Sequence, residues 1–187
     1  MQGIMAVFAG IGLSATCGFR VFIPLLGISI AHHTGHLALS PGFEWIGSWP
    51  ATIAFAAAMI IEIGGYYIPW VDNLLDTVAT PAAIVAGTIV TASMVGDLSP
   101  FLRWSLAVIA GGGVAGVVQS SSVLARSIST TTTGGTGNPV VSTVELLAAI
   151  FGTIVSMVLP FIAIALVALI MFFILRRIFR RRAKAAS

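Results

Sequence analysis

Residues 14–24, "SATCGFRVFIP", place Arg20 inside a long apolar run that extends from residue 2 to residue 31. A charged side chain in the hydrocarbon region of a membrane costs about 3 kcal/mol even on lenient insertion scales. Arg20 either snorkels to the membrane interface along its long stem, or takes part in an ion pair or a binding site. Small residues precede Arg20 and Pro24 follows it, a pattern that favours a helix opening around a cavity. We therefore expect the second role.

The composition indicates that lipid surrounds the chain. The sequence is 58% hydrophobic and 8% charged, whereas a soluble domain typically has about 25% charged residues. A soluble domain needs a charged exterior that this sequence cannot supply. We predict an all-α integral membrane protein. The single cysteine, Cys17, excludes an intramolecular disulfide.

The sequence contains few features that are typical of enzymes. There is no Ser/His/Asp constellation in a recognisable context and no nucleotide-binding loop. His32, His33 and His36 lie close together, but a solvated loop is the simpler interpretation because only Glu44 nearby could complete a metal site. We predict that the protein is not an enzyme and holds no metal or cofactor.

Most of the positive charge lies at the C-terminus. Six of the nine Lys and Arg residues follow position 175. Such a cluster can neutralise phosphates of nucleic acid, but directly after an apolar span it marks a cytoplasmic membrane end that favours anionic lipid headgroups. We expect a transmembrane domain over residues 1–177 in the inner (plasma) membrane, a basic cytoplasmic tail over 178–187, membrane lipids as partners, and no nucleic acid.

Apolar runs long enough to cross a bilayer recur along the chain. Pro160 divides the last of them, because proline breaks or kinks a helix interior; one kinked helix there would make five spans instead of six. With six spans and a cytoplasmic tail, the N-terminus is cytoplasmic and the loop at residues 31–49 faces outward. The expected spans are residues 2–31, 50–68, 77–96, 102–125, 139–159 and 161–177.

The two halves of the chain show weak internal similarity. Residues 47–62, "GSWPATIAFAAAMIIE", and residues 137–152, "GNPVVSTVELLAAIFG", each begin with Gly and an early Pro and carry one glutamate. The first span of each half has one arginine, Arg20 or Arg126. This pattern predicts two inverted three-helix repeats, over about 2–96 and 102–177, with a polar loop between spans four and five.

Acidic residues in or beside the spans are candidates for function. Glu62 cannot reach the headgroups, so we expect it to face Arg20 or Arg126, either as a structural ion pair or as a group that exchanges protons and couples transport to them. Asp72 and Asp76 are four residues apart and share one helix face. One of the two is expected to cap the third span, leaving the other as a ligand.

Residues 127–145, "SISTTTTGGTGNPVVSTVE", form the longest polar passage. The alternatives are a flexible cytoplasmic linker and an irregular loop that binds an ion or polar solute ahead of a helix starting at Pro139. The arginine before it and the glutamate after it favour the binding loop. The full set of predicted binding residues is Arg20, Glu62, Asp72, Arg126, Thr131, Thr132, Thr133, Gly135, Gly137, Asn138, Ser142 and Glu145.

Several phrases together resemble one known family. They are "GLSATCGFRVFIPLL", "FEWIGSWPA", "VDNLLDTV", "GDLSP" and "STTTTGGTGNPVVSTVE", which extend over nearly the whole chain. The sequence is similar to the domain of unknown function 4126 family of small integral membrane proteins. The resemblance names no activity, and no residue role is carried over from it.

The sequence therefore predicts a small transporter or channel for a polar or zwitterionic solute or an ion, with proton coupling as an option. A chain with so few helices encloses a pathway more readily as a homodimer. The alternative is a lipid-handling protein, such as a scramblase, a flippase or an enzyme acting on headgroups, which a groove open to lipid would favour. A structural subunit without a substrate is the third possibility.

Overall fold

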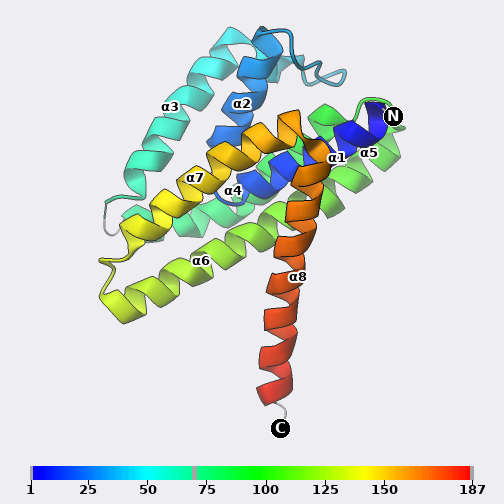
Figure 1. Ribbon diagram of the computed structural model, residues 1–187. Coiled ribbons are helices and arrows are strands. Elements are labelled where there is room, and N and C mark those ends of the chain that lie inside the picture. The colour runs from blue at the N-terminus through cyan, green and yellow to red at the C-terminus, as the bar shows by residue number, and fades with distance from the viewer. Residues whose placement is uncertain (1, 69–70, 186–187) are drawn as a thin grey trace.

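The computed structural model describes residues 2–68 and 71–185, and every regular element in these ranges is helical (Figure 1). The order is α1 (Gln2–Cys17), α2 (Phe22–His33), the short 3₁₀ helix η1 (Glu44–Gly47), α3 (Trp49–Gly65), α4 (Val71–Met94), α5 (Pro100–Leu106), the π-helical η2 (Ala107–Gly112), α6 (Gly113–Thr133), α7 (Asn138–Val158) and α8 (Pro160–Ala185).

Three stretches of helix are long and apolar enough to cross a membrane: Leu74–Met94, Pro100–Thr133 and Asn138–Val158. Shorter apolar helices cover Gly3–Cys17, Phe22–His33, Trp49–Gly65 and Pro160–Ile174. The outward side chains are largely aliphatic or aromatic, a surface that suits lipid and not water. The prediction of an all-helical membrane protein is confirmed.

The first apolar run folds back on itself between α1 and α2. Along α7, Gly12 lies against Ser156, and Thr153 donates a hydrogen bond to Thr16 at 3.3 Å. Arg20 then reaches the carbonyl of Ser142, and Gly27 returns to Thr153. The two helices therefore run in opposite directions along α7, with the reversal at residues 18–21.

The expectation of one span over residues 2–31 is wrong, although the predicted interruption at Arg20 is confirmed. α1 has 16 residues and α2 has 12, so they extend about 24 Å and 18 Å, less than the ~30 Å hydrocarbon core. Arg20 and Val21 at the tip are buried, as irregular backbone at membrane depth requires. Pro24 does not interrupt α2, because it lies in the first turn, where the missing N–H costs no helix bond.

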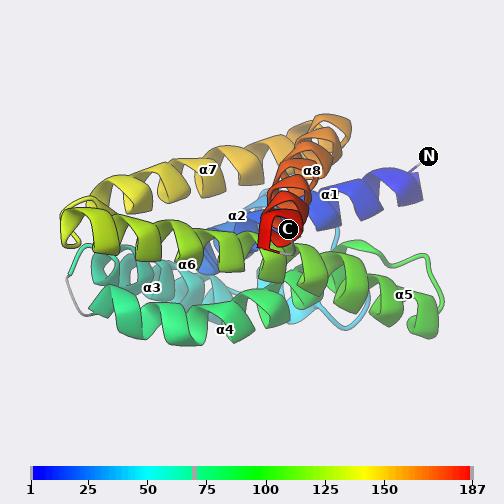
Figure 2. The same ribbon diagram turned by 90° about the horizontal axis from the view of Figure 1, so that it is seen from below.

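Small residues bring α1, α4 and η2 into close contact. The Ser14 hydroxyl lies 2.6 Å from that of Thr91 and donates to the Gly87 carbonyl at 2.7 Å. A Cβ on Gly111 would collide with the same Gly87 carbonyl oxygen. Close backbone approach through glycine and serine is the usual way that membrane helices associate. In Figure 2, α6 lies between α4 and α7, so these helices form a layer against which the α1–α2 reversal packs.

The chain breaks before Pro160, as predicted: Leu159 leaves the helical conformation with φ −133° and ψ 64°. α8 then begins against α1, where Phe8 and Phe161 make an edge-to-face contact with ring centroids 5.5 Å apart. Figure 1 shows α8 running steeply away from the bundle, so its C-terminal half lies apart from the other helices.

The start of the chain and the loop after α2 lie at the same end of the bundle. Ser40 donates its backbone N–H to the carbonyl of Ser93 near the C-terminus of α4, at 2.8 Å. Gly3 lies beside Asp97, just beyond the same helix. The turn between α6 and α7 lies at the opposite end. A first span that crossed the membrane would separate Gly3 from Ser40, and the reversal removes that separation.

This arrangement makes a labelling prediction. Gly3→Cys and His36→Cys should react with a membrane-impermeant maleimide from the same side of a sealed membrane, and Thr136→Cys, in the α6–α7 turn, only from the other. Cys17, the natural cysteine, is buried and serves as the unlabelled background. Labelling of Gly3→Cys together with Thr136→Cys, and not with His36→Cys, would restore the continuous first span.

Candidate functional site

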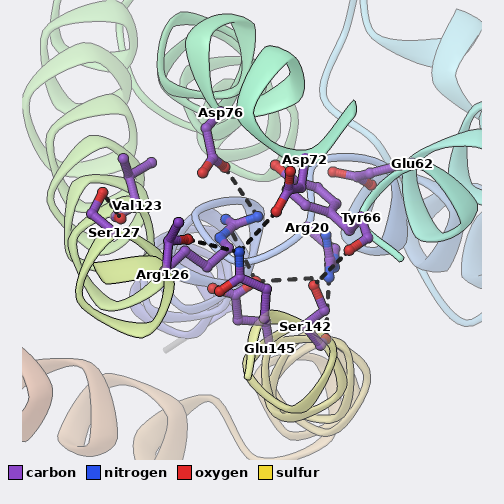
Figure 3. A network of polar contacts seen from close by, with 12 residues as sticks. Arg20, Glu62, Tyr66, Asp72, Asp76, Val123, Arg126, Ser127, Ser142 and Glu145 are labelled. Atoms are coloured by element: carbon purple, nitrogen blue, oxygen red, sulfur yellow. Dashed lines mark hydrogen bonds and ion pairs between the residues drawn. The ribbon is translucent and has the colours of Figure 1, made fainter. Parts of the chain in front are cut away.

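Charged and polar side chains from α3, α4, α6, α7 and the α1–α2 tip meet inside the bundle (Figure 3). Arg126 lies seven residues before the end of α6 at Thr133, and Glu145 lies seven residues after the start of α7 at Asn138. Arg126 and Glu145 are thus each about 10 Å from the α6–α7 turn, at 1.5 Å per helical residue. We call this site the charge cluster; its members are Arg20, Glu62, Tyr66, Asp72, Asp76, Arg126, Asn138, Ser142 and Glu145.

Tyr66, at the C-terminal end of α3, brings the two arginines together. The guanidinium carbons of Arg20 and Arg126 lie 3.9 Å and 4.1 Å from the centroid of its ring. The three residues are only 1%, 2% and 3% exposed. A cation–π contact shielded from water contributes about 2 kcal/mol, so the ring offsets part of the cost of burying two positive charges.

Glu145 is shared between both arginines. Its Oε2 atom lies 3.7 Å from Nη2 of Arg20 and 3.5 Å from Nη2 of Arg126. Charge-assisted hydrogen bonds are shorter, about 2.7–2.9 Å, so neither of these contacts is a hydrogen bond. Asp76 on α4 approaches more closely, with Oδ1 3.0 Å from Nη1 of Arg126. The firm ion pair therefore joins α4 to α6, and Glu145 bridges loosely from α7.

Glu62 has a different role from the predicted one. Its carboxylate accepts hydrogen bonds from the backbone N–H groups of Val21 at 2.8 Å and Phe22 at 3.2 Å. It therefore caps the start of α2 and is not the ion-pair partner of Arg20 or Arg126. The physical reason is the reversal itself, which leaves free N–H groups at a new helix N-terminus, where a carboxylate is favoured.

Asp72 and Asn138 connect three helices. The side-chain amide of Asn138, at the start of α7, donates to Oδ2 of Asp72 in the first turn of α4 and to the hydroxyl of Thr130 in α6, both at 2.9 Å. Asp72 lies in the first turn of α4 and accepts from Asn138, and Asp76, one turn later, pairs with Arg126.

The threonines do not form the predicted irregular loop. α6 continues to Thr133, and the hydroxyls of Thr131, Thr132 and Thr133 donate to carbonyls one turn earlier, at 3.1, 2.8 and 2.7 Å. These hydrogen bonds satisfy the hydroxyls inside the helix, and all three residues are exposed. The prediction that they line a site is wrong.

The turn is confined to residues 134–137, three of which are glycines. Gly134 and Gly135 have φ of 65° and 91°, conformations that favour glycine. Gly137 donates its N–H to the Thr133 hydroxyl at 2.9 Å. Gly135 and Gly137 therefore reverse the chain about 10 Å from Arg126 and Glu145, although Gly137 directly precedes Asn138 of the charge cluster. Their predicted binding role is not supported.

The fold brings the other predicted residues together, and two members of the charge cluster, Tyr66 and Asp76, are not among the predicted binding residues. Asp76 was recognised as sharing a face with Asp72, yet it was not among the predicted binding residues. Tyr66 carried one usable signal, because it follows Glu62 by one helical turn and so lies on the same face of α3. The predicted residues that the fold brings together are Arg20, Glu62, Asp72, Arg126, Asn138, Ser142 and Glu145.

The charge cluster has more acidic than basic groups. Two arginines face four carboxylates, a formal excess of two negative charges. The N-termini of α2, α4 and α7 converge here, and each helix N-terminus carries roughly half a positive charge. The helix dipoles therefore offset much of the excess, which lets the cluster exist in a membrane protein.

Several buried donors remain available. Nε and Nη1 of Arg20 and Nε of Arg126 have no acceptor in hydrogen-bonding geometry among residues 2–68 and 71–185. Most buried polar groups in proteins are hydrogen-bonded. Guanidinium groups donate only. Oδ1 of Asn138 and both carboxylate oxygens of Glu145 also lack hydrogen-bond partners among the described residues, so the cluster holds unmatched donors and unmatched acceptors.

The helical bundle with its buried ion pairs defines a polytopic α-helical membrane protein. A family described as "Domain of unknown function (DUF4126)" matches residues 7–180, and the chain belongs to this family. The match includes every member of the charge cluster. No curated protein and no solved structure matches the chain.

The ion pair between α4 and α6 gives a stability prediction. Arg126→Gln and Asp76→Asn should each destabilise the protein, because each leaves a buried charge without its partner, at a cost of about 3 kcal/mol. The double variant should cost less than the sum of the two. Denaturant unfolding in detergent micelles measures the coupling energy.

A matched cycle uses Arg103, an arginine of α5 that lies 5.7 Å from the Phe43 ring and outside the charge cluster. Arg103→Gln combined with Asp76→Asn should be additive within about 0.5 kcal/mol. Additivity in both cycles would mean that Arg126 and Asp76 do not interact in the folded protein.

Proposed function

We propose that the protein is a membrane transporter or channel for a small polar solute or an ion, with the charge cluster as its binding site. The observation that carries the proposal is the pair of buried arginines on Tyr66 that share Glu145. Ionisable groups inside membrane proteins are costly and mark solute or ion pathways. The proposal concerns binding and passage, not catalysis.

The broken helix at the cluster supports passage. Transporters commonly place their sites where discontinuous helices present N-termini to a substrate, and α2 begins at such a break. The cluster lies within a few helical turns of the α6–α7 end, so a modest opening there would admit water. The excess of carboxylates supports coupling to protons, since protonation of a carboxylate would reduce the negative charge of the site.

The topology that we propose differs from six equivalent spans. α3, α4, the continuous α5–η2–α6, α7 and α8 cross the membrane, and α1 and α2 form a re-entrant pair. The basic residues at the C-terminal end of α8 then lie in the cytoplasm against anionic lipid, at the inner (plasma) membrane, and residues 34–42 lie outside. A homodimer would provide the additional helices that enclose a pathway.

The predicted inverted repeats have support from one feature. Arg20 and Glu62 of the first half meet Arg126 and Glu145 of the second in a single cluster, and α3 and α7 each have proline in the first turn. The first segments differ, because residues 2–31 reverse direction whereas Pro100–Thr133 is continuous. The repeats stay a prediction for the spans that follow those segments.

A second candidate function, lipid handling, has an observation of its own. A cavity of about 240 Å³ lies between α3 and α4, with mostly apolar walls and with Glu62 and Tyr66 among its lining residues. Ile61 and Val78, also in the lining, are 71% and 58% exposed on the outer surface. The cavity therefore opens towards the surrounding lipid, and an acyl chain there would bring its headgroup near the cluster.

Flux measurements test the proposal. Purified protein in liposomes should admit at least one of protons, sodium, acetate or glycine faster than protein-free liposomes do. Arg126→Gln and Glu145→Gln should reduce that flux about tenfold or more, the change that follows from losing about 1.4 kcal/mol of interaction. Arg103→Gln and Thr132→Ala, which lie outside the charge cluster, should leave it unchanged.

The same vesicles separate the two candidate functions. Transbilayer movement of fluorescent phospholipid without solute flux, abolished by Val78→Trp, which fills the α3–α4 cavity, would replace the transporter with a lipid-handling protein. Equal flux through all four charge and control variants would show that the charge cluster is not the pathway.

A further inference from the structure

We infer that the group held by the charge cluster is a small oxyanion, a carboxylate or a phosphate, bound between Arg20 and Arg126 in place of the Glu145 carboxylate. The inference rests on the proposed function and names the chemical class of its ligand. Glu145 acts as an internal stand-in that occupies the anion position while no ligand is bound.

The geometry of the arginines supports a shared anion. One carboxylate oxygen of Glu145 lies 3.7 Å and 3.5 Å from the Nη2 atoms of Arg20 and Arg126, so these two nitrogens are no more than about 7 Å apart. Glu145 is too far from either nitrogen for a hydrogen bond, which closes at about 2.8 Å. A ligand with two or more oxygens can accept from both forks at once, as planar guanidinium groups favour.

The hydrogen-bond donors without acceptors belong to positively charged arginines, which an anion would bind. Nε and Nη1 of Arg20 and Nε of Arg126 lack acceptors within the described part of the chain, although the two arginines are at most 2% exposed. Arg20 is fixed in place by the 3.1 Å hydrogen bond from its Nη2 to the Ser142 carbonyl. Its remaining nitrogens are therefore held in position and still able to donate.

Three of the four acidic groups have close partners within the protein, whereas both carboxylate oxygens of Glu145 lack a hydrogen bond. Both oxygens of Glu62 accept backbone N–H groups, and Asp76 pairs with Arg126. Asp72 accepts from Asn138. Among the described residues no three His, Cys, Asp or Glu side chains are grouped so that they could hold a metal ion. The N-terminus of α7 adds a partial positive charge on the same side, so the site favours an oxyanion over a metal cation.

Binding to the full-length protein in detergent tests the inference. Acetate and inorganic phosphate, added at constant ionic strength, should raise the melting temperature by ligand linkage, and choline chloride should not. Arg20→Gln and Arg126→Gln should abolish the shift, and Arg103→Gln should retain it. Glu145→Gln removes the competing charge and should lower the Kd for the oxyanion about tenfold or more, since like charges exclude each other at one site.

A further arm of the experiment distinguishes a lipid headgroup from a soluble oxyanion. Phosphatidic acid in mixed micelles presents the same phosphate on a lipid. Stabilisation by phosphatidic acid alone, lost in Arg20→Gln and in Val78→Trp, would assign the oxyanion to a headgroup seated beside the α3–α4 cavity. Stabilisation by free acetate or phosphate would assign it to a soluble solute.

Failure of the inference and failure of the proposed function give different results. If no oxyanion shifts the melting temperature of the wild type or of Glu145→Gln, the inference of an oxyanion ligand is wrong. Sodium or proton flux in the same protein would still support the proposed transporter. Oxyanion binding without flux of any solute would keep the site and overturn transport. If the arginine variants do not fold, the tighter binding in Glu145→Gln decides, and unchanged affinity there overturns the inference.

Discussion

The hydrogen bonds from Val21 and Phe22 to the carboxylate of Glu62 hold the reversal between α1 and α2 in place. Without an acceptor there, two N–H groups at a new helix start would be buried unsatisfied, at about 1–3 kcal/mol each. The reversal in turn places Arg20 against Tyr66, and Tyr66 brings Arg20 to Arg126. One carboxylate on α3 thus determines how the first segment of the chain reaches the charge cluster.

The charge cluster shows how a membrane protein can bury several ionised groups at once. No single partner neutralises them. Arg126 faces an aspartate, a shared glutamate and an aromatic ring, and the acids lie at or near helix N-termini. Each contribution is modest, about 0.3–2 kcal/mol, but all act in one place that lipid and packed glycines shield from water. The same shielding makes the cluster sensitive to any charge that a ligand brings.

The class of fold and much of the cluster were predictable from the sequence, because charges in apolar spans are rare and have few reasons to be there. Arg20, Arg126 and Glu145 were found in this way. The pairing was not predictable. A lone arginine and a lone glutamate suggest an ion pair, and only the fold shows that Glu62 accepts a hydrogen bond from the backbone instead. The length of the apolar run also suggested the wrong topology, because two short helices in opposite directions have the same sequence pattern as one interrupted span.

The prediction of an irregular loop at the threonines was wrong for a local reason. β-Branched residues and a nearby glycine pair suggest irregular backbone, yet each hydroxyl can return its hydrogen bond to the preceding turn and keep the helix. The sequence signal for the turn lay in the glycines that followed. Tyr66 had no strong signal, because an aromatic residue at a span end is common in membrane proteins.

The π-helical segment Ala107–Gly112 lies in the N-terminal half of the long helix Pro100–Thr133 that carries Arg126. A π turn accommodates one residue more than an α turn. Release of that residue into α-helical form would turn α6 by about 100° and shift it by about 1.5 Å along its axis. Arg126 would then leave the Tyr66 ring and Asp76 while α5 kept its place. A local change of winding in this segment would thus rotate the distant arginine.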